Sequence, residues 1–285
     1  MKLFLIRLLN KVGLLQYLIF NVTTQIYSIK FTIPLIKGIG LKNIITTEPW
    51  MVNLLQKLLP ITNDDVFIDI GVNIGQTLLK LKAVNKEMTY VGFEPNPSAV
   101  FYTNELIKAN RFKNTSLIPV GLNNKTEVLT LNIYNSSDVD PSASILTEFR
   151  PSQKVVQEVN IPVFNVNELS NLKPTLEKVS ILKIDVEGAE LEVLQSLETI
   201  IKTATPFILM EILPVYNTEN RYRIERQEKI EILLSQLDYS IYRIIKSKSI
   251  SFERIESIEV HSDIDKCDYI FVPNNKVTAF SNLPK

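Results

Sequence analysis

The sequence contains a single cysteine and no excess of either charge, and each of these two shortages excludes a class of protein. Cys267 is the only cysteine, so the chain has neither an internal disulfide nor a paired-cysteine metal or redox site. This fits a reducing compartment, and we expect the protein in the cytoplasm. Basic and acidic residues number 31 each, so nothing predicts a general affinity for nucleic acid.

The chain also lacks a long apolar run, although residues 1–20 are rich in leucine, isoleucine and phenylalanine. Five polar residues interrupt that segment: Lys2, Arg7, Asn10, Lys11 and Gln16. The segment therefore falls well short of the roughly 18 apolar residues of a spanning helix, and no signal-peptide cleavage pattern follows it. We expect one helix over residues 1–20, which either packs on the protein or makes peripheral contact with the inner face of the membrane.

Residues 27–45 alternate in patches around Pro34 and Gly38, a pattern typical of a β-hairpin. With the helix, they predict an N-terminal helical and hairpin extension over residues 1–47, followed by one domain over residues 48–285. At this length the domain can bury a sizeable core.

The segment that organises this domain is a buried strand that runs into a glycine turn. Residues 66–70 are apolar except for Asp69, as expected of an interior parallel strand. Gly71 and Gly75 follow and allow a tight turn, and residues 76–82 are good helix formers. In open α/β sheets such a turn lies at the crevice where ligands bind, with helix N–H groups pointing toward it.

Strands and helices alternate through the rest of the domain, which predicts an α/β fold with a mostly parallel sheet and helices on both faces. Apolar runs predict strands over residues 88–94, 116–121, 179–185, 206–213, 239–245 and 267–272. The helical pattern covers residues 99–109, 189–201 and 225–237. Residues 127–134 and 155–164 are expected to form an insertion in the edge of the sheet.

The glycine turn favours one class of cofactor over another. A nicotinamide dinucleotide needs Gly-x-Gly-x-x-Gly, whose middle glycine admits the pyrophosphate, and here Asn73 stands in that place. S-adenosylmethionine carries no phosphate, and its ribose hydroxyls could donate hydrogen bonds to Glu94, which ends the next strand. The sequence therefore favours S-adenosylmethionine.

Three motifs follow one another along the chain: DIGVNIG at residues 69–75, FEPNP at 93–97 and KIDVEGAE at 183–190. In this order they resemble the FkbM family of S-adenosylmethionine-dependent methyltransferases. The resemblance implies a Rossmann-like class I methyltransferase sheet of seven strands, the last of them antiparallel, and O-methylation as the usual activity. It implies cofactor contacts for Asp69, Gly71, Asn73, Gly75 and Glu94. Val72 departs from the family pattern, in which alanine is more usual, and slightly narrows the turn.

The resemblance leaves the catalytic residue open, and the sequence offers two candidates. Methyl transfer from a sulfonium to a hydroxyl requires alignment of the reactants and a base for the hydroxyl proton. Asp185, at the end of an apolar strand beside the crevice, is the first candidate, and Glu187 is the second. Glu187 could instead serve only to stabilise the start of the next helix. We do not expect Lys183 to pair with Asp185, because its side chain shares that face only at the rim.

Three further features bear on the site. Glu211 also lies in an apolar strand and could converge with Asp185, and the pair would then suit Mg²⁺, although we assign no residue as a metal ligand. Residues 138–144 could close over a substrate or form a plain connection. His261, the only histidine, lies in a polar segment, and we expect it in an exposed loop.

These observations predict an S-adenosylmethionine-dependent O-methyltransferase that acts on a hydroxyl of a sugar, a glycan precursor or a secondary metabolite. The acceptor class rests on the resemblance alone. The alternative is a non-catalytic adaptor that keeps the fold and docks through residues 1–20 to a membrane-associated glycan assembly complex. Cofactor binding without turnover would favour the adaptor.

Overall fold

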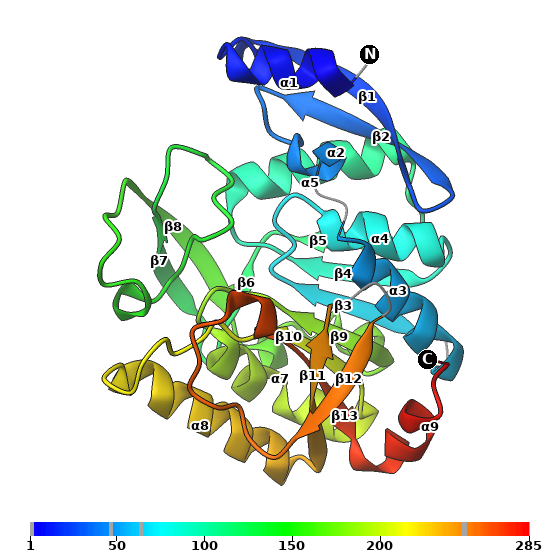
Figure 1. The fold of residues 1–285 in the computed structure, drawn as a ribbon, viewed down its shortest axis with the longest axis vertical. Coiled ribbons are helices and arrows are strands. Elements are labelled where there is room, and N and C mark those ends of the chain that lie inside the picture. Colours follow the sequence, from blue (N-terminus) through cyan, green and yellow to red (C-terminus); the bar gives the residue numbers. More distant parts are fainter. Residues whose placement is uncertain (1–2, 46–47, 63–64, 247–249, 285) are drawn as a thin grey trace.

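The computed structural model describes residues 3–45, 48–62, 65–246 and 250–284. Within these residues the strands form three sheets, of eight, three and two strands. The eight-stranded sheet lies at the centre of the molecule, with the hairpin at one end and the three-stranded sheet to one side (Figure 1).

The central sheet has the strand order β12, β11, β13, β10, β9, β3, β4, β5. Its strands in chain order are β3 (Val66–Ile70), β4 (Thr89–Phe93), β5 (Thr115–Ile118), β9 (Val179–Ile184), β10 (Phe207–Glu211), β11 (Tyr239–Ile245), β12 (Ser251–Ile255) and β13 (Asp268–Pro273). The run from β10 to β5 is parallel, and β13 lies antiparallel to both β10 and β11. The predicted α/β sheet with an antiparallel last strand is confirmed. β12, which pairs with β11, adds an eighth strand that its mostly exposed residues did not reveal.

Alternate side chains of the central strands bury two cores, one on each face of the sheet. On one face, Ile68 and Ile70 of β3 pack with α7 (Glu190–Ala204) and α8 (Arg221–Gln236). On the other face, Phe67 packs with α3 (Pro49–Leu58), α4 (Gln76–Val84) and α9 (Val277–Ser281). A short helix, α6 (Lys173–Leu176), leads into β9. Because both faces are covered, a carboxylate within these strands must be held by specific partners.

The N-terminal extension has a shorter helix and an earlier hairpin than the sequence predicts. α1 (Leu3–Lys11) ends before Gly13, whose φ is +72°, and residues 1–2 lie outside the described residues. β1 (Ile19–Ile26) pairs with β2 (Ile29–Ile36), and α2 (Lys42–Ile45) follows. The prediction of one helix over residues 1–20 and a hairpin over 27–45 is therefore wrong in extent. The β-branched residues from position 19 onward favour a strand.

The extension shares a hydrophobic core with the rest of the chain. Ile6 of α1 and Phe31 of β2 belong to one cluster with Tyr102 of α5 (Pro97–Asn110). The Asn110 side chain accepts a hydrogen bond from the Thr32 backbone N–H and donates one to the Thr32 carbonyl, each at 2.8 Å. The extension is thus held firmly against α5. Within the described ranges no helix is both long enough and apolar enough to cross a membrane.

A second difference concerns the insertion, here residues 121–164. Pro119 cannot donate a ladder hydrogen bond, so β5 stops at Ile118 and the chain leaves the central sheet. β6 (Gly121–Leu122), β8 (Gln157–Phe164) and β7 (Glu127–Ile133) then form the separate three-stranded sheet. The prediction of an insertion in the edge of the sheet is therefore wrong, because β6, β7 and β8 pair with one another and, among the described residues, with no strand of the central sheet.

Candidate active site

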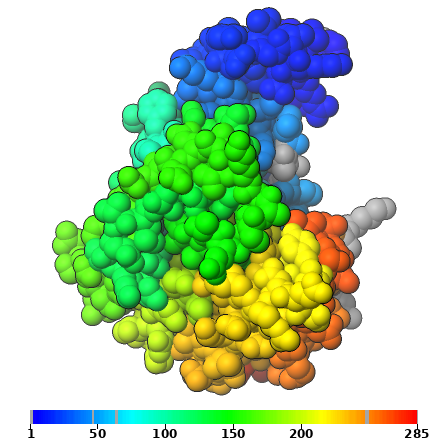
Figure 2. Space-filling model, turned by 90° about the vertical axis from the view of Figure 1, so that its left-hand side faces the viewer, coloured from blue at the N-terminus to red at the C-terminus, as the bar shows by residue number. Residues whose placement is uncertain are grey.

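A cavity of about 280 Å³ lies at the carboxyl ends of β3, β4, β9 and β10. Because parallel strands all end at the same edge of the sheet, their terminal residues meet there. The start of α3 contributes to the lining, and the insertion forms one wall. Figure 2 shows the insertion, in green, spread over this face of the molecule below the blue extension.

Residues 138–144 of the insertion lie over the cavity, and Asp140, Pro141 and Ala143 line it. The buried Asp140 carboxylate accepts hydrogen bonds from the backbone N–H groups of Tyr134 (2.8 Å) and Ser142 (3.0 Å). These bonds fix the path of the loop, which serves as a wall of the cavity in this conformation.

Gly71 sits where the ends of β3 and β9 come into close contact. Its φ is +89°, and a Cβ at this position would lie 1.9 Å from the carbonyl oxygen of Asp185. The Gly71 N–H donates to the Phe93 carbonyl at 3.0 Å, and the Asp185 N–H donates to the Ile70 carbonyl at 3.0 Å. Only glycine allows this approach, so the turn brings the first and third motifs together at one end of the cavity.

Glu94 and Asn73 form a second part of the cavity wall. Glu94 accepts hydrogen bonds from the backbone N–H groups of Asn73 (2.7 Å) and Asn96 (2.8 Å). Burial raises the pKa of Glu94 to about 7, although these two donors oppose the shift. The Asn73 Oδ1 and Gln76 Nε2 atoms are buried and have no hydrogen-bond partner among the described residues. Both atoms can therefore form hydrogen bonds with a polar ligand.

Asp69 and Gly75 lie behind the cavity lining and do not face the cavity. Asp69 is fully buried, accepts a hydrogen bond from the Tyr90 hydroxyl at 2.7 Å and lies 3.5 Å from Lys183 Nζ. Burial raises the pKa of Asp69, and Lys183 opposes the shift. A Cβ at Gly75 would lie 2.8 Å from the Leu106 side chain of α5. Both residues hold the turn in place from behind.

The Val72 side chain fits into the turn because the neighbouring strand β4 has a glycine, Gly92, opposite it. A Cβ at Gly92 would lie 2.5 Å from a methyl carbon of Val72, so the missing side chain on β4 makes room for the larger residue in the turn.

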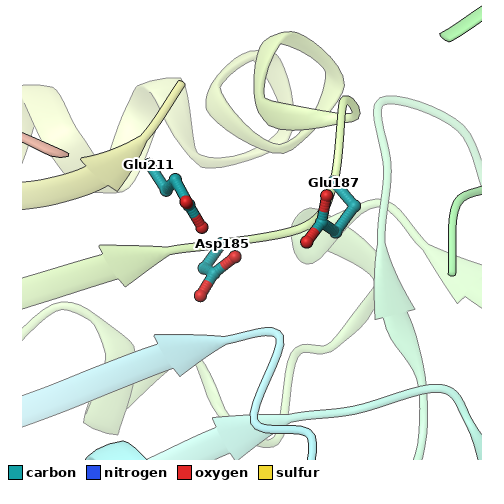
Figure 3. Close-up of side chains that lie close together, drawn as sticks. All are labelled: Asp185, Glu187 and Glu211. Atoms are coloured by element: carbon teal, nitrogen blue, oxygen red, sulfur yellow. The ribbon is translucent and has the colours of Figure 1, made fainter. Parts of the chain in front are cut away.

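Three carboxyl groups also converge in the cavity lining, one from the residue just after β9, one from the turn that follows and one from the end of β10. Figure 3 shows Glu211 and Glu187 pointing toward Asp185 from either side. Ligand atoms of the three residues all lie within 4.8 Å of one another. We call this set the acidic cluster.

Lys183 supports the acidic cluster from within β9. Its Nζ lies 3.0 Å from Asp185 Oδ2 and 3.5 Å from Asp69 Oδ1. The prediction that Lys183 does not pair with Asp185 is wrong, because Asp185 lies just beyond the end of β9, where its side chain can meet that of Lys183. Lys183, which belongs to the third motif, thereby contacts both Asp69 of the first motif and Asp185 of the third.

The three carboxyl groups differ in their affinity for protons. Burial and then the charges of Asp185, Asp268 and Glu187 raise the pKa of Glu211 to about 9, so Glu211 holds a proton at neutral pH. Burial opposes ionisation of Asp185, yet Lys183 and a hydrogen bond from Glu211 hold its pKa below the usual range. Burial and the charge of Asp185 raise the pKa of Glu187 to about 7, against the effect of Arg150. Glu187 is therefore the member that titrates near neutral pH.

The insertion holds Glu187 in an unusual backbone conformation. The φ of Glu187 is +53°, in the left-handed region that side-chain-bearing residues seldom adopt. The Ser144 hydroxyl donates to the Glu187 carbonyl at 2.7 Å, and Arg150 forms an ion pair with the Glu187 carboxylate. Strained residues of this kind cluster at functional sites, and these contacts aim the side chain at Asp185.

The acidic cluster fits a proton-sharing arrangement better than a Mg²⁺ site. Lys183 already contacts Asp185 and Arg150 forms an ion pair with Glu187, so two of the three carboxylates are paired with cations of the protein itself. A divalent ion would need these carboxylates free and ionised.

His261 lies apart from the cavity and is half-buried, so the expectation of an exposed loop histidine is wrong. Its Nε2 lies 3.2 Å from the Tyr269 hydroxyl. The backbone around it is held to the loop between β10 and α8, since the Tyr216 N–H donates to the His261 carbonyl at 3.0 Å.

Several cavity residues have no clear signal in the sequence. Trp50 and Glu48 come from the start of α3, Lys80 from α4, and Lys246 and Asp268 from the ends of β11 and β13. Lys80 forms an ion pair with Glu48, and Lys246 forms one with Asp268. Only Lys80 could have been suspected, because a lysine on the buried face of a helix needs a partner.

Comparisons with known proteins give matches to methyltransferases. The family model described as "Methyltransferase FkbM domain" matches residues 69–241. The chain is also 28% identical over 151 residues to "Methyltransferase 1" of Beauveria bassiana (strain ARSEF 2860), an alignment that covers 49% of this chain and 61% of that protein. The chain thus spans about three fifths of the length of this relative.

Solved structures with a similar fold include a methyltransferase FkbM from Methylobacillus flagellatus KT. It has a TM-score of 0.46 and 16% identity, and the match covers 73% of this chain and 44% of that chain. A Podospora anserina methyltransferase bound to SAH has a TM-score of 0.40 and 11% identity, with 79% and 76% covered.

Proposed function

The chain belongs to the FkbM family of methyltransferases, and we propose that it transfers a methyl group from S-adenosylmethionine to a hydroxyl of a sugar or glycan precursor. One observation carries the proposal: a single cavity is lined both by Glu94 with unpaired amide groups and by the acidic cluster. The first set of groups suits a methyl donor and the second suits an acceptor hydroxyl.

The groups around Glu94 are those that would bind S-adenosylmethionine. Ionised Glu94 would accept hydrogen bonds from ribose hydroxyls, because each oxygen has a further acceptor site beyond its backbone donor. Asn73 and Gln76 would pair with the polar amino acid part of the donor. Gly71, with no side chain, lets the Asp185 carbonyl pack against the turn that carries Asn73. When bound, S-adenosylmethionine supplies the electrophilic methyl group.

The part of the cavity lining that we assign to the acceptor has an aromatic side chain and several carboxyl groups. Trp50 is half-buried in the cavity wall, with Lys246 Nζ 5.0 Å from the centre of its ring. Glu48 and Asp268 lie in the same lining. Sugars present both apolar C–H faces and many hydroxyls, so an aromatic wall with surrounding carboxyl groups suits them.

Within the acidic cluster, we assign proton removal to Glu187. Its pKa of about 7 matches the working pH of a general base, whereas Asp185 gains a proton only at much lower pH. Asp185 is ionised and would accept a hydrogen bond from the acceptor hydroxyl, which orients it. As the oxygen bonds to the methyl carbon and the sulfur bond breaks, the hydroxyl proton passes to Glu187. The products are a methyl ether and S-adenosylhomocysteine.

Most of the acceleration would come from alignment. Holding two reactants in line can lower a barrier by about 7–11 kcal/mol, and a base adds about 10²–10⁴-fold in rate. The closely packed strand ends at Gly71 and the fixed wall of the insertion provide that alignment.

Methyl-labelled S-adenosylmethionine tests the proposal. Incubated with the protein and a pool of extracted glycans and nucleotide sugars, it should give acceptors that carry one labelled methyl group, with an equal amount of S-adenosylhomocysteine. Mass spectrometry measures both products. Failure to label any pool that contains free sugar hydroxyls, by a protein that binds the donor, would contradict the proposal and favour the adaptor.

A further inference from the structure

We propose that the outer face of the N-terminal extension docks on an anionic lipid surface. Large apolar side chains stand exposed there: Phe4, Leu8, Val12, Tyr17 and Ile19. We name this set the apolar stripe. Phe4 is 77% exposed, Tyr17 76% and Ile19 69%. A group of large exposed apolar side chains of this kind, close together in the sequence, marks an interaction surface.

The helix geometry directs the stripe away from the protein. Phe4 and Leu8 are spaced by four residues, so they lie above one another on one side of α1, and Val12 follows in the turn after the helix, where its N–H donates to the Leu8 carbonyl at 3.0 Å. Ile6 is fully buried against the domain and lies on the opposite side. In Figure 1, α1 lies at the outermost edge of the molecule, beyond the hairpin.

The charge of the N-terminal extension indicates which kind of surface it would bind. Residues 1–47 contain six basic residues and no acidic one, although the whole chain has equal numbers of each. The described ones are Arg7, Lys11, Lys30, Lys37 and Lys42. All five are exposed, and none forms an ion pair within the described part of the chain. Apolar side chains flanked by unpaired cations are typical of helices that lie in the interface of anionic membranes.

A second copy of the chain fits this face less well. In a two-fold dimer the same patch meets itself, so Arg7 and Lys11 would approach their own copies with no acidic partner in the extension. Like charges in an interface oppose association. A bilayer with acidic headgroups instead neutralises these cations while its acyl chains cover the stripe.

A groove connects this surface with the active-site cavity. It runs between the extension and the insertion and includes Asn10, Ile19 and Phe101, and it shares Asn73, Gln76 and Pro141 with the cavity. If the proposed function holds, docking would bring the groove close to acceptors carried by the membrane. Lipid binding itself does not depend on methyl transfer and is tested without a donor.

Vesicle flotation tests the docking. The full chain should float with phosphatidylcholine vesicles that contain about one third phosphatidylglycerol, and far less with phosphatidylcholine alone. The double change Phe4→Ser and Leu8→Ser should weaken binding by at least about a hundredfold. Arg7→Gln with Lys11→Gln should weaken it by about thirtyfold and reduce its salt dependence. All four side chains are exposed, so the variants should melt at the wild-type temperature.

Matched controls lie on α8, at exposed positions far along the chain. Ile232→Ser and Lys229→Gln should leave vesicle binding unchanged. Equal binding by wild type and the Phe4, Leu8 double variant would overturn the proposal. So would a wild-type dimer that this variant converts to a monomer, because the stripe would then be an interface between copies.

Discussion

A Glu187→Gln variant is expected to lose about 10²–10⁴-fold in turnover while binding S-adenosylmethionine as tightly as the wild type. Glutamine keeps the size of the side chain but cannot accept the proton of the acceptor hydroxyl. Glu187 belongs to the acidic cluster, which we assign to the acceptor, and Glu94 is no member of that cluster, so donor affinity should not depend on Glu187. Single-turnover methyl transfer together with donor titration separates the two effects.

The pH profile identifies which carboxylate is the base. With saturating donor, wild-type turnover should rise with pH up to about 7 and then level off, because Glu187 must be ionised and its pKa is about 7. Saturation removes the contribution of Glu94, whose pKa is also about 7 and which acts on donor binding. If Asp185 were the base, turnover would stay flat from pH 5 to 8, since the pKa of Asp185 lies below its usual range.

Two companion variants complete this test. Asp185→Asn should lower turnover less than Glu187→Gln, because it removes orientation and leaves the base. Glu148→Gln changes an exposed carboxylate in the insertion, away from the cavity lining, and should retain wild-type turnover. Full activity in Glu187→Gln together with none in Asp185→Asn would reverse the assignment of the base.

The second large effect concerns stability. Lys183→Met should lower the free energy of unfolding by about 3–5 kcal/mol, because it leaves the fully buried Asp69 without its cation. Lys183 is 9% exposed, so solvent screens the interaction little. Urea unfolding monitored by circular dichroism measures the change.

The loss in Lys183→Met should shrink as the pH falls. Burial already raises the pKa of Asp69, and without Lys183 the carboxyl would take up a proton at still higher pH. Protonation removes the buried charge, so acid stabilises the variant relative to neutral solution. Adding Asp69→Asn should restore part of the loss at pH 7. The control Lys178→Met, at an exposed position just before β9, should change stability by less than about 0.5 kcal/mol. A loss below about 1 kcal/mol in Lys183→Met would show that the cation is not needed there.

Local pattern was enough to predict the central sheet except for β12, and the edge of the sheet at which the cavity lies. The strand at residues 66–70 and the glycine turn after it have a period and composition that few other structures share. β11 falls on the residues predicted, and β13 begins and ends within one residue of its predicted limits. These elements are decided by their own residues, so the sequence reports them directly.

Features that depend on pairing across the fold could not be read in this way. The insertion leaves the central sheet because one proline interrupts β5, a small signal beside the strand pattern around it. Arg150 reaches Glu187 from a segment with no regular period. The pairing of Lys183 with Asp185 does not follow from the alternation of side chains in a strand, because Asp185 lies beyond the end of β9, where that alternation no longer holds.

Donor binding to Glu94 is the most direct test of the account. Isothermal titration should show S-adenosylmethionine binding to the wild type, and Glu94→Gln should weaken it by about ten- to a hundredfold through loss of charged hydrogen bonds. Glu127→Gln, at an exposed carboxylate of β7, should bind as the wild type does. Binding that is unchanged in a correctly folded Glu94→Gln variant would contradict the assignment of this cavity to the methyl donor.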